Sequence, residues 1–141
     1  MLESLKKYKK QGHFTFNQSN DLEEVCNAPN DGAGVYLMFS VDGDKKELVY
    51  VGSSGSIQNN GEIKVRQGGL FDRLVHGKQF KMTRKKSLPV EMKREKMETL
   101  EIHWFETFTE KEKGIPTCVE AELIQTYFNN NGCLPKWNVA F

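Results

Sequence analysis

The sequence lacks the features that mark membrane, secreted or disulfide-linked proteins. No apolar run approaches the roughly 18 residues that a membrane span needs. The opening segment, Met1 to Lys7, has no long apolar stretch of the kind found in secretory signals. Cysteine occurs only three times, at Cys26, Cys118 and Cys133, without metal-ligand spacing. These absences favour a soluble, cytoplasmic chain with reduced thiols and no membrane partner.

Repeats and nucleotide-binding loops are also absent. The polar segment 53–69 is rich in Ser, Asn and Gly, but it lacks the Gly-Lys-Ser/Thr ending of a phosphate-binding P-loop. The 141 residues, of which 38% are hydrophobic, match the usual size of one domain with a buried core. A single soluble domain is therefore expected.

A net charge of only +1 conceals a strongly basic middle segment. Residues 64–96 contain eleven Lys and Arg against three Asp and Glu, a local charge of +8. Phe71 and Phe80 lie among these cations, which is a pattern typical of nucleic-acid surfaces. The alternative is a solvated helical face. The candidate DNA-binding side chains are Lys64, Lys78, Lys81, Arg84, Lys85 and Lys86.

Hydrophobic periodicity predicts an α+β fold. The expected strands cover 34–40, 47–52 and 99–108, and the expected helices cover 70–78 and 117–130. Residues 81–97 form a basic segment interrupted by Pro89, and 62–66 alternate enough for a small strand. These elements give a small three-stranded antiparallel sheet flanked by helices, in the order β-β-α-β-α. Residues 1–32 are expected to form a helix and coil extension, and 33–141 the main domain.

Two short strings lie in the first two expected strands, Gly34-Val35-Tyr36 and Tyr50-Val51-Gly52. A three-residue loop at 42–44 places Tyr36 opposite Tyr50 on one side of the sheet, whereas an even loop separates them. Glycines beside the tyrosines allow a ligand to approach the strand backbone closely. The alternative is an aromatic pair in an ordinary core.

The last expected helix carries one glutamate in an unusual position. At 100° per residue, Glu120 falls near the centre of the apolar sector, whereas Glu122 points to the opposite side. A carboxylate on a buried face is costly unless it is paired or holds a metal ion. Glu120 therefore either meets backbone N–H groups or a buried arginine, or binds a cation in a cleft.

Three further polar side chains are candidates for a site. Arg73 and His76 lie three residues apart on the polar side of the short helix, so they can address the same object. An arginine suits a phosphate because its planar fork donates two parallel hydrogen bonds. The alternative is that both are surface side chains with no role in a site. Asn138 is either a capping residue or a polar group that completes a site.

Together these strings resemble the GIY-YIG nuclease family over residues 34–138. Gly34-Val35-Tyr36 is similar to the first signature of the family, and Tyr50-Val51-Gly52 to the second. The remaining similarities are Arg73 to the arginine of the first core helix, Glu120 to the metal-binding glutamate, and Pro135 to Asn138 to the closing proline and asparagine. Residues 53–69 look like an insertion in such a domain, which here spans 33–141.

The resemblance implies a metal-dependent endonuclease that hydrolyses DNA phosphodiester bonds. It implies one Mg²⁺ or Mn²⁺ ion held by Glu120, and Arg73 donating to a phosphate oxygen. Tyr36 is the expected base, with Tyr50 orienting water or phosphate, although the reverse assignment stays open. His76 or Lys64 would assist and Asn138 would complete the site. The family often places a histidine one helical turn after the arginine, whereas His76 follows Arg73 by three residues.

Two other functions stay open at this point. One is a nucleic-acid-binding module that keeps the fold without cleaving, and the other is an interaction protein whose basic stretch meets an acidic partner. DNA is the expected partner in the first two cases. The sequence leaves open whether the chain acts alone or as a homodimer.

Overall fold

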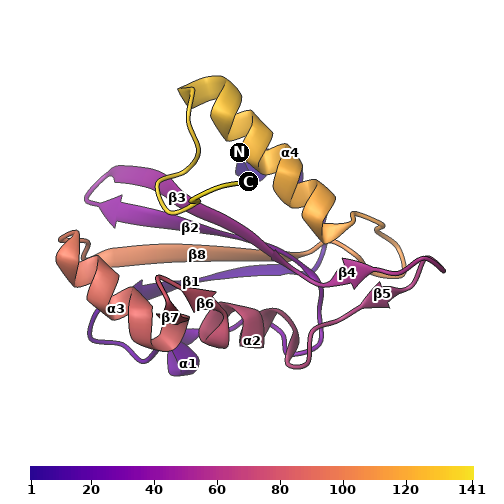
Figure 1. Ribbon diagram of the computed structural model, residues 1–141, viewed down its shortest axis with the longest axis horizontal. Helices are drawn as coiled ribbons and strands as arrows, with labels where there is room; N and C mark the ends of the chain where they lie inside the picture. Colours follow the sequence, from indigo (N-terminus) through magenta and orange to yellow (C-terminus); the bar gives the residue numbers. More distant parts are fainter.

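A four-stranded antiparallel sheet forms the centre of the computed structural model, which describes all 141 residues (Figure 1). The strand order is β1-β8-β2-β3. The strands are β1 (Gln11–Asn17), β2 (Gly34–Asp42), β3 (Lys45–Ser54) and β8 (Thr99–Glu106). The α+β class is confirmed, and β2, β3 and β8 correspond to the three strands expected from the sequence.

Helices cover both faces of this sheet. On one side lie α1 (Leu22–Val25), α2 (Gly69–His76) and α3 (Arg84–Arg94), and on the other lies α4 (Pro116–Asn131) (Figure 1). The remaining elements are the 3₁₀ helix η1 (Leu2–Leu5), the hairpin of β4 (Ser56–Ile57) and β5 (Ile63–Lys64), and the hairpin of β6 (Lys78–Gln79) and β7 (Met82–Thr83). None of the helices combines the length and the apolar character needed to span a bilayer.

The fourth strand was not expected from the sequence. Residues 11–17, assigned to a coil extension, form β1 and pair with β8, with His13 opposite His103. Phe14 and Phe16 are buried while Thr15 between them is exposed, which is the alternation of a half-buried strand. The N-terminal residues thus add an edge strand to the sheet.

The hairpin of β2 and β3 has a different register from the expected one. Asp42 pairs with Lys45, so the loop has two residues rather than three. Tyr36 lies opposite Gly52, and Tyr50 lies opposite Met38. A bulge next to Met38 shifts the register by one residue, and this shift keeps both tyrosines on the same face despite the even loop. Their ring centroids are 6.1 Å apart on the diagonal.

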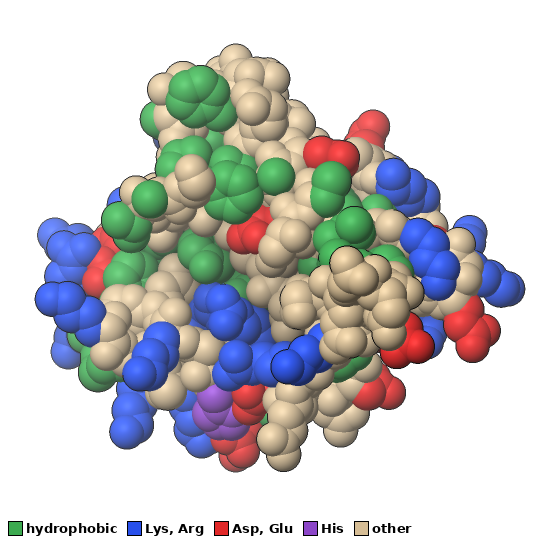
Figure 2. Space-filling model, turned by 45° about the vertical axis from the view of Figure 1, so that its right-hand side comes forward, with side chains coloured by type: hydrophobic (Ala, Val, Ile, Leu, Met, Phe, Trp, Pro, Cys, Tyr) green, Lys and Arg blue, Asp and Glu red, His purple; other side chains and the backbone are tan.

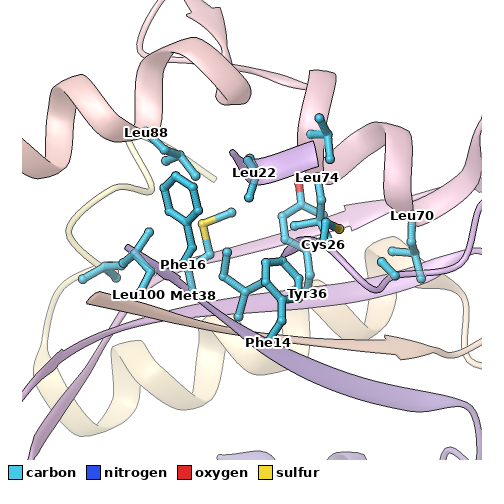
Figure 3. Packing of buried hydrophobic residues seen from close by; sticks show 14 of the residues in the cluster. Phe14, Phe16, Leu22, Cys26, Tyr36, Met38, Leu70, Leu74, Leu88 and Leu100 are labelled. Atoms are coloured by element: carbon cyan, nitrogen blue, oxygen red, sulfur yellow. The ribbon is translucent and has the colours of Figure 1, made fainter. Parts of the chain in front are cut away.

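Each face of the sheet has its own hydrophobic core. The core beneath α1, α2 and α3 contains 16 buried residues, including Tyr36, Met38 and Leu74 (Figure 3). The core beneath α4 contains 11, including Val35 and Leu123. Because β2 is buried on both faces from Gly34 to Phe39, it has a continuous apolar sequence instead of an alternating one.

Helix α4 has the usual residues at its two ends, whereas α3 contains a proline in its interior. Helix α4 has a proline in its first turn and is followed by Gly132, which adopts the left-handed φ of 72° that is typical of a glycine C-cap. Helix α3 continues through Pro89, where the sequence suggested an interruption. The proline leaves one carbonyl without its helical donor, and the packing of Leu88 and Met92 into the core keeps the helix continuous.

Candidate active site

Gly34 and Gly52, the glycines of the two sequence strings, leave room for neighbouring atoms of the protein and not for a ligand. A Cβ atom on Gly52 would lie 2.5 Å from Cζ of Tyr36, so the tyrosine ring occupies the space above this glycine. A Cβ atom on Gly34 would clash with the backbone carbonyl of Phe105 on the neighbouring strand. The expectation that these glycines open the backbone to a ligand is therefore wrong.

Both tyrosines contact a buried arginine. Tyr36 is fully buried and Tyr50 is half-buried. The guanidinium carbon of Arg84 lies 5.0 Å from the ring centroid of Tyr36 and 5.3 Å from that of Tyr50. Arg84 was expected on a DNA-binding surface, but its exposed fraction is 1%. A basic run does not reveal which of its members turns inward, so no sequence signal marked Arg84.

Neutral groups make the hydrogen bonds of Arg84. Its Nε donates to Oε1 of Gln79 over 2.8 Å, and its Nη1 donates to the carbonyl oxygen of Arg73 over 2.5 Å. Gln79 lies at the end of β6, just before a two-residue turn in which Phe80 and Lys81 have φ angles of 55° and 70°. Such left-handed backbone costs roughly 1–2 kcal/mol per non-glycine residue. The Phe80 ring packs edge-on against Trp137 and helps to hold this turn.

Arg73 projects from α2 toward the tyrosines and a basic cleft. Its Nε is buried without a hydrogen-bond partner, and the Tyr36 hydroxyl is equally without one. Burial lowers the pKa of Arg73, but the nearby phenol oxygens of Tyr36 and Tyr50 and the Glu120 carboxylate outweigh that effect and raise it. The arginine thus stays charged beside the two phenols.

Glu120 lies in the first turns of α4, beside the end of β3. It is half-buried, and its Oε1 accepts a 2.7 Å hydrogen bond from Oγ of Ser53. Burial raises the pKa of Glu120, against the opposing effects of the Ser53 hydroxyl and the positive charge of Arg73. Glu122 is exposed, as the helical periodicity predicted. Ser53 directly follows the second sequence string, but sequence reasoning did not single it out.

A cleft of about 440 Å³ lies between the end of β3, the β4–β5 hairpin and the start of α4. Lys64, Arg66 and Arg73 supply three cations to its lining, and Ser53 and Thr117 supply hydroxyls. Figure 2 shows a band of Lys and Arg side chains across the lower part of one face of the molecule. Lys64, predicted within the inserted segment, is thereby brought to the same cleft as Arg73.

His76 does not join this cluster. Its Nδ1 lies 2.9 Å from Oδ1 of Asp72, and its Nε2 lies 3.5 Å from Oε1 of Glu23. Burial tends to raise the pKa of Asp72, but hydrogen bonds from His76 and Arg66 outweigh it and lower the pKa. His76 is therefore part of an exposed network of charged groups on α2.

Asn138 supports the site from the outer edge of the sheet. Its side-chain amide donates to the carbonyl of Val51 and accepts from the N–H of Val51, each over 3.0 Å. The backbone N–H of Trp137 donates to the carbonyl of Val49. The chain end thus pairs with β3 and fixes the segment that carries Tyr50.

The predicted DNA-binding cations divide into three groups. Lys64, Lys78, Lys81 and Lys86 are exposed and form no ion pair. Lys85 is paired with Glu23 at 3.1 Å and with Asp21 at 3.7 Å. Arg84 is buried. The exposed basic surface near the cleft is therefore smaller than the sequence suggested.

Comparison with protein families, with curated proteins and with solved structures finds no match to this chain.

Proposed function

We propose that the chain is a metal-dependent endonuclease that hydrolyses DNA phosphodiester bonds. The observation that carries this proposal is the position of Arg73, which lines a basic cleft beside two tyrosines and near Glu120, whose carboxylate accepts from the cleft residue Ser53. Apart from α3 and the two small hairpins, β2, β3, α2, β8 and α4 occur in this order along the chain, which supports the proposal. The three cysteines form no disulfide, which suits a reducing, cytoplasmic setting.

Glu120 is a suitable ligand for a metal ion. No group of three His, Cys, Asp or Glu side chains forms a ready-made metal site. Mg²⁺ is commonly held by one or two carboxylates together with waters and substrate phosphates, so a single glutamate at a cleft fits this cation. One Mg²⁺ or Mn²⁺ ion per site would supply positive charge against the negative charge that develops on the phosphate.

The other residues have separable roles. Arg73, which lines the cleft, donates to a non-bridging phosphate oxygen. A deprotonated tyrosine takes a proton from water, the water oxygen bonds to phosphorus, and the bond from phosphorus to the 3′ oxygen breaks. The departing 3′ oxygen takes a proton from solvent, so the products are a 3′ hydroxyl and a 5′ phosphate. Tyr50 is the more exposed of the two rings, so accessibility favours it as the base over Tyr36, the choice made from sequence. Lys64 binds phosphate in the cleft, and Asn138 holds β3 in place.

The second candidate is a nucleic-acid-binding module that does not cleave. The basic cleft favours it, because the unpaired cations Lys64 and Arg73 attract a polyanion whether or not chemistry follows. This candidate requires neither the tyrosine hydroxyls nor the Glu120 carboxylate.

Incubation with supercoiled plasmid separates the two candidates. The nuclease yields nicked or linear DNA with Mg²⁺ or Mn²⁺ and none with EDTA, and the Tyr50→Phe protein, purified in parallel, controls for contaminating nucleases. Salt-sensitive binding without cleavage in either metal supports the module. Absence of both binding and cleavage contradicts both candidates.

A further inference from the structure

Arg84 is a buried cation without an acidic partner. It is the bulkiest of the fully buried side chains, and no ion pair includes it. Arginine is rarely buried unless paired, because removing a charge from water is costly. The groups around its guanidinium are a glutamine oxygen, a backbone carbonyl and two tyrosine rings. The fold alone does not account for a charge placed there.

The position of Arg84 connects three parts of the site. Its backbone N–H donates to the carbonyl of Gly77 over 2.9 Å, and its side chain donates to the carbonyl of Arg73. These carbonyls lie at the C-terminal end of α2, where a positive charge is favourable. A Cβ atom on Gly77 would lie 2.8 Å from Nη1 of Arg84, so the glycine leaves room for the guanidinium. Arg84 thus ties the helix that carries Arg73 to the two tyrosines.

Charged groups from three helices face the tyrosine pair. Arg73 comes from α2, Arg84 from α3 and Glu120 from α4. Burial and the neighbouring Tyr36 raise the pKa of Tyr50, and Glu120 adds to this, whereas Arg84 and Arg73 lower it. The two arginines therefore oppose a strong tendency of this pocket to keep the phenol protonated.

We propose that Arg84 is a positioning residue of the site, whose buried charge holds the two tyrosines beside Arg73 and favours the phenolate form of the base. Its part in cleavage rests on the proposed nuclease function. Its effect on phenol ionisation does not, and it can be measured without DNA.

Gln79→Glu tests this proposal with little change of shape. The obvious variant, Arg84→Met, can fail to fold, whereas Gln79→Glu keeps the oxygen that accepts from Arg84. The amide nitrogen that it removes is buried without a partner. The new carboxylate offsets the field of Arg84 at the tyrosines, so we expect the pKa of Tyr50 to rise by about one unit. Thermal stability should be unchanged or higher because the buried cation gains a partner.

The titration can be followed by ¹⁹F NMR of protein labelled with 3-fluorotyrosine. The phenol of 3-fluorotyrosine has a lower pKa than that of tyrosine, so it titrates at a pH at which folded proteins survive. The chain has four tyrosines, and the Tyr→Phe variants assign their signals. Tyr8 packs in the opposite core and serves as the internal reference. Gln125→Glu, on the exposed side of α4, adds the same charge away from Arg84 and should shift neither Tyr36 nor Tyr50.

Cleavage provides the second measurement. A base with a raised pKa is protonated over a wider pH range, so the acid limb of the rate profile should move to higher pH. We expect kcat near neutral pH to fall about tenfold in Gln79→Glu, with KM for DNA nearly unchanged. If the parental protein cleaves no DNA while the titration shifts as expected, the nuclease proposal fails and the role of Arg84 in phenol ionisation stands.

Two results would overturn the role of Arg84. One is a folded Gln79→Glu protein in which neither Tyr36 nor Tyr50 shifts relative to Tyr8. The other is loss of folding in Gln79→Glu, because an unpaired buried cation should tolerate a carboxylate beside it.

Discussion

Cations on the outer side of α2 are paired with acidic side chains, whereas cations on the side that faces the tyrosines are not. On the outer side, Arg66 binds Asp72 through a 2.8 Å ion pair, and Asp72 also binds His76. On the inner side, Arg84 contacts two phenol rings, a backbone carbonyl and an amide oxygen, Arg73 lies beside the same phenols, and neither arginine forms an ion pair. The exposed charges are neutralised within the chain, whereas the buried ones are not.

This difference indicates which charges await an external anion. Exposed ion pairs contribute little to stability, about 0–1 kcal/mol, and leave little free charge for a ligand. Buried cations without partners are unfavourable in the isolated protein, and such groups are concentrated at functional sites. Of the two inner arginines only Arg73 lines the cleft, so it is the one that we propose to meet a phosphate, whereas the outer network serves local structure.

Substituting one arginine from each side should give the largest contrast. Arg73→Met should reduce cleavage about 10²- to 10³-fold, because it removes a donor to the phosphate during reaction. Arg66→Met should reduce it less than tenfold, because Asp72 already occupies that guanidinium. Initial rates of plasmid nicking measure both. Equal losses in the two variants would end the distinction between the inner and outer cations.

The tyrosine hydroxyls should have the next largest effect. Tyr50→Phe should slow cleavage by about 10²-fold, a usual contribution of a general base. Tyr36→Phe should leave folding intact, because the hydroxyl that it removes is buried and unpartnered. Tyr127→Phe in α4, outside the site, is the matched control. Cleavage at the parental rate in both site variants would exclude a tyrosine base.

Much of this site was predictable from the sequence, because local periodicity fixes which side chains share a face. The two tyrosine strands and the helix that begins near residue 117 follow from such periodicity. The same reasoning separated half-buried Glu120 from exposed Glu122.

What could not be predicted depends on contacts between distant segments. The bulge near Met38 is set by sheet pairing, and the left-handed turn at Phe80 and Lys81 lacks the usual Asn-Gly signal. The burial of Arg84 follows from that turn and from the end of α2, so a basic sequence run conceals it. Strand β1 was different, since Phe14 and Phe16 already showed the two-residue period.

The exposed lysines should produce a smaller change, in affinity. Replacing Lys78, Lys81 and Lys86 together with Glu should weaken DNA binding and flatten the plot of log K against log salt. The slope should fall by about 0.9 for each phosphate that the variant no longer neutralises. Lys85→Glu alone should change the slope least, because Glu23 and Asp21 already bind that lysine. A slope that stays constant in the triple variant would remove this surface from the DNA interface.

The smallest expected effect is on stability as a function of pH. Because the folded-state pKa of Glu120 is raised, its contribution to stability is fully present below the ordinary glutamate pKa, about 4.3, and is lost as pH rises through the folded-state value. Glu120→Gln should therefore match the parental thermal stability near pH 4 and exceed it near pH 7. Thermal unfolding at both pH values measures this. A stability difference between Glu120→Gln and the parental protein that becomes smaller as the pH rises would contradict the burial of this charge.

The most direct test of the account compares plasmid cleavage in Mg²⁺ by Glu120→Gln and Glu122→Gln. The two substitutions are chemically identical and lie two residues apart, but only Glu120 is half-buried and accepts from Ser53, a residue that lines the cleft. The account predicts that Glu120→Gln abolishes cleavage while DNA binding persists, because a neutral amide is a poor ligand for a hard cation. Glu122→Gln should cleave at the parental rate. Cleavage that survives in Glu120→Gln and disappears in Glu122→Gln would contradict the proposed site.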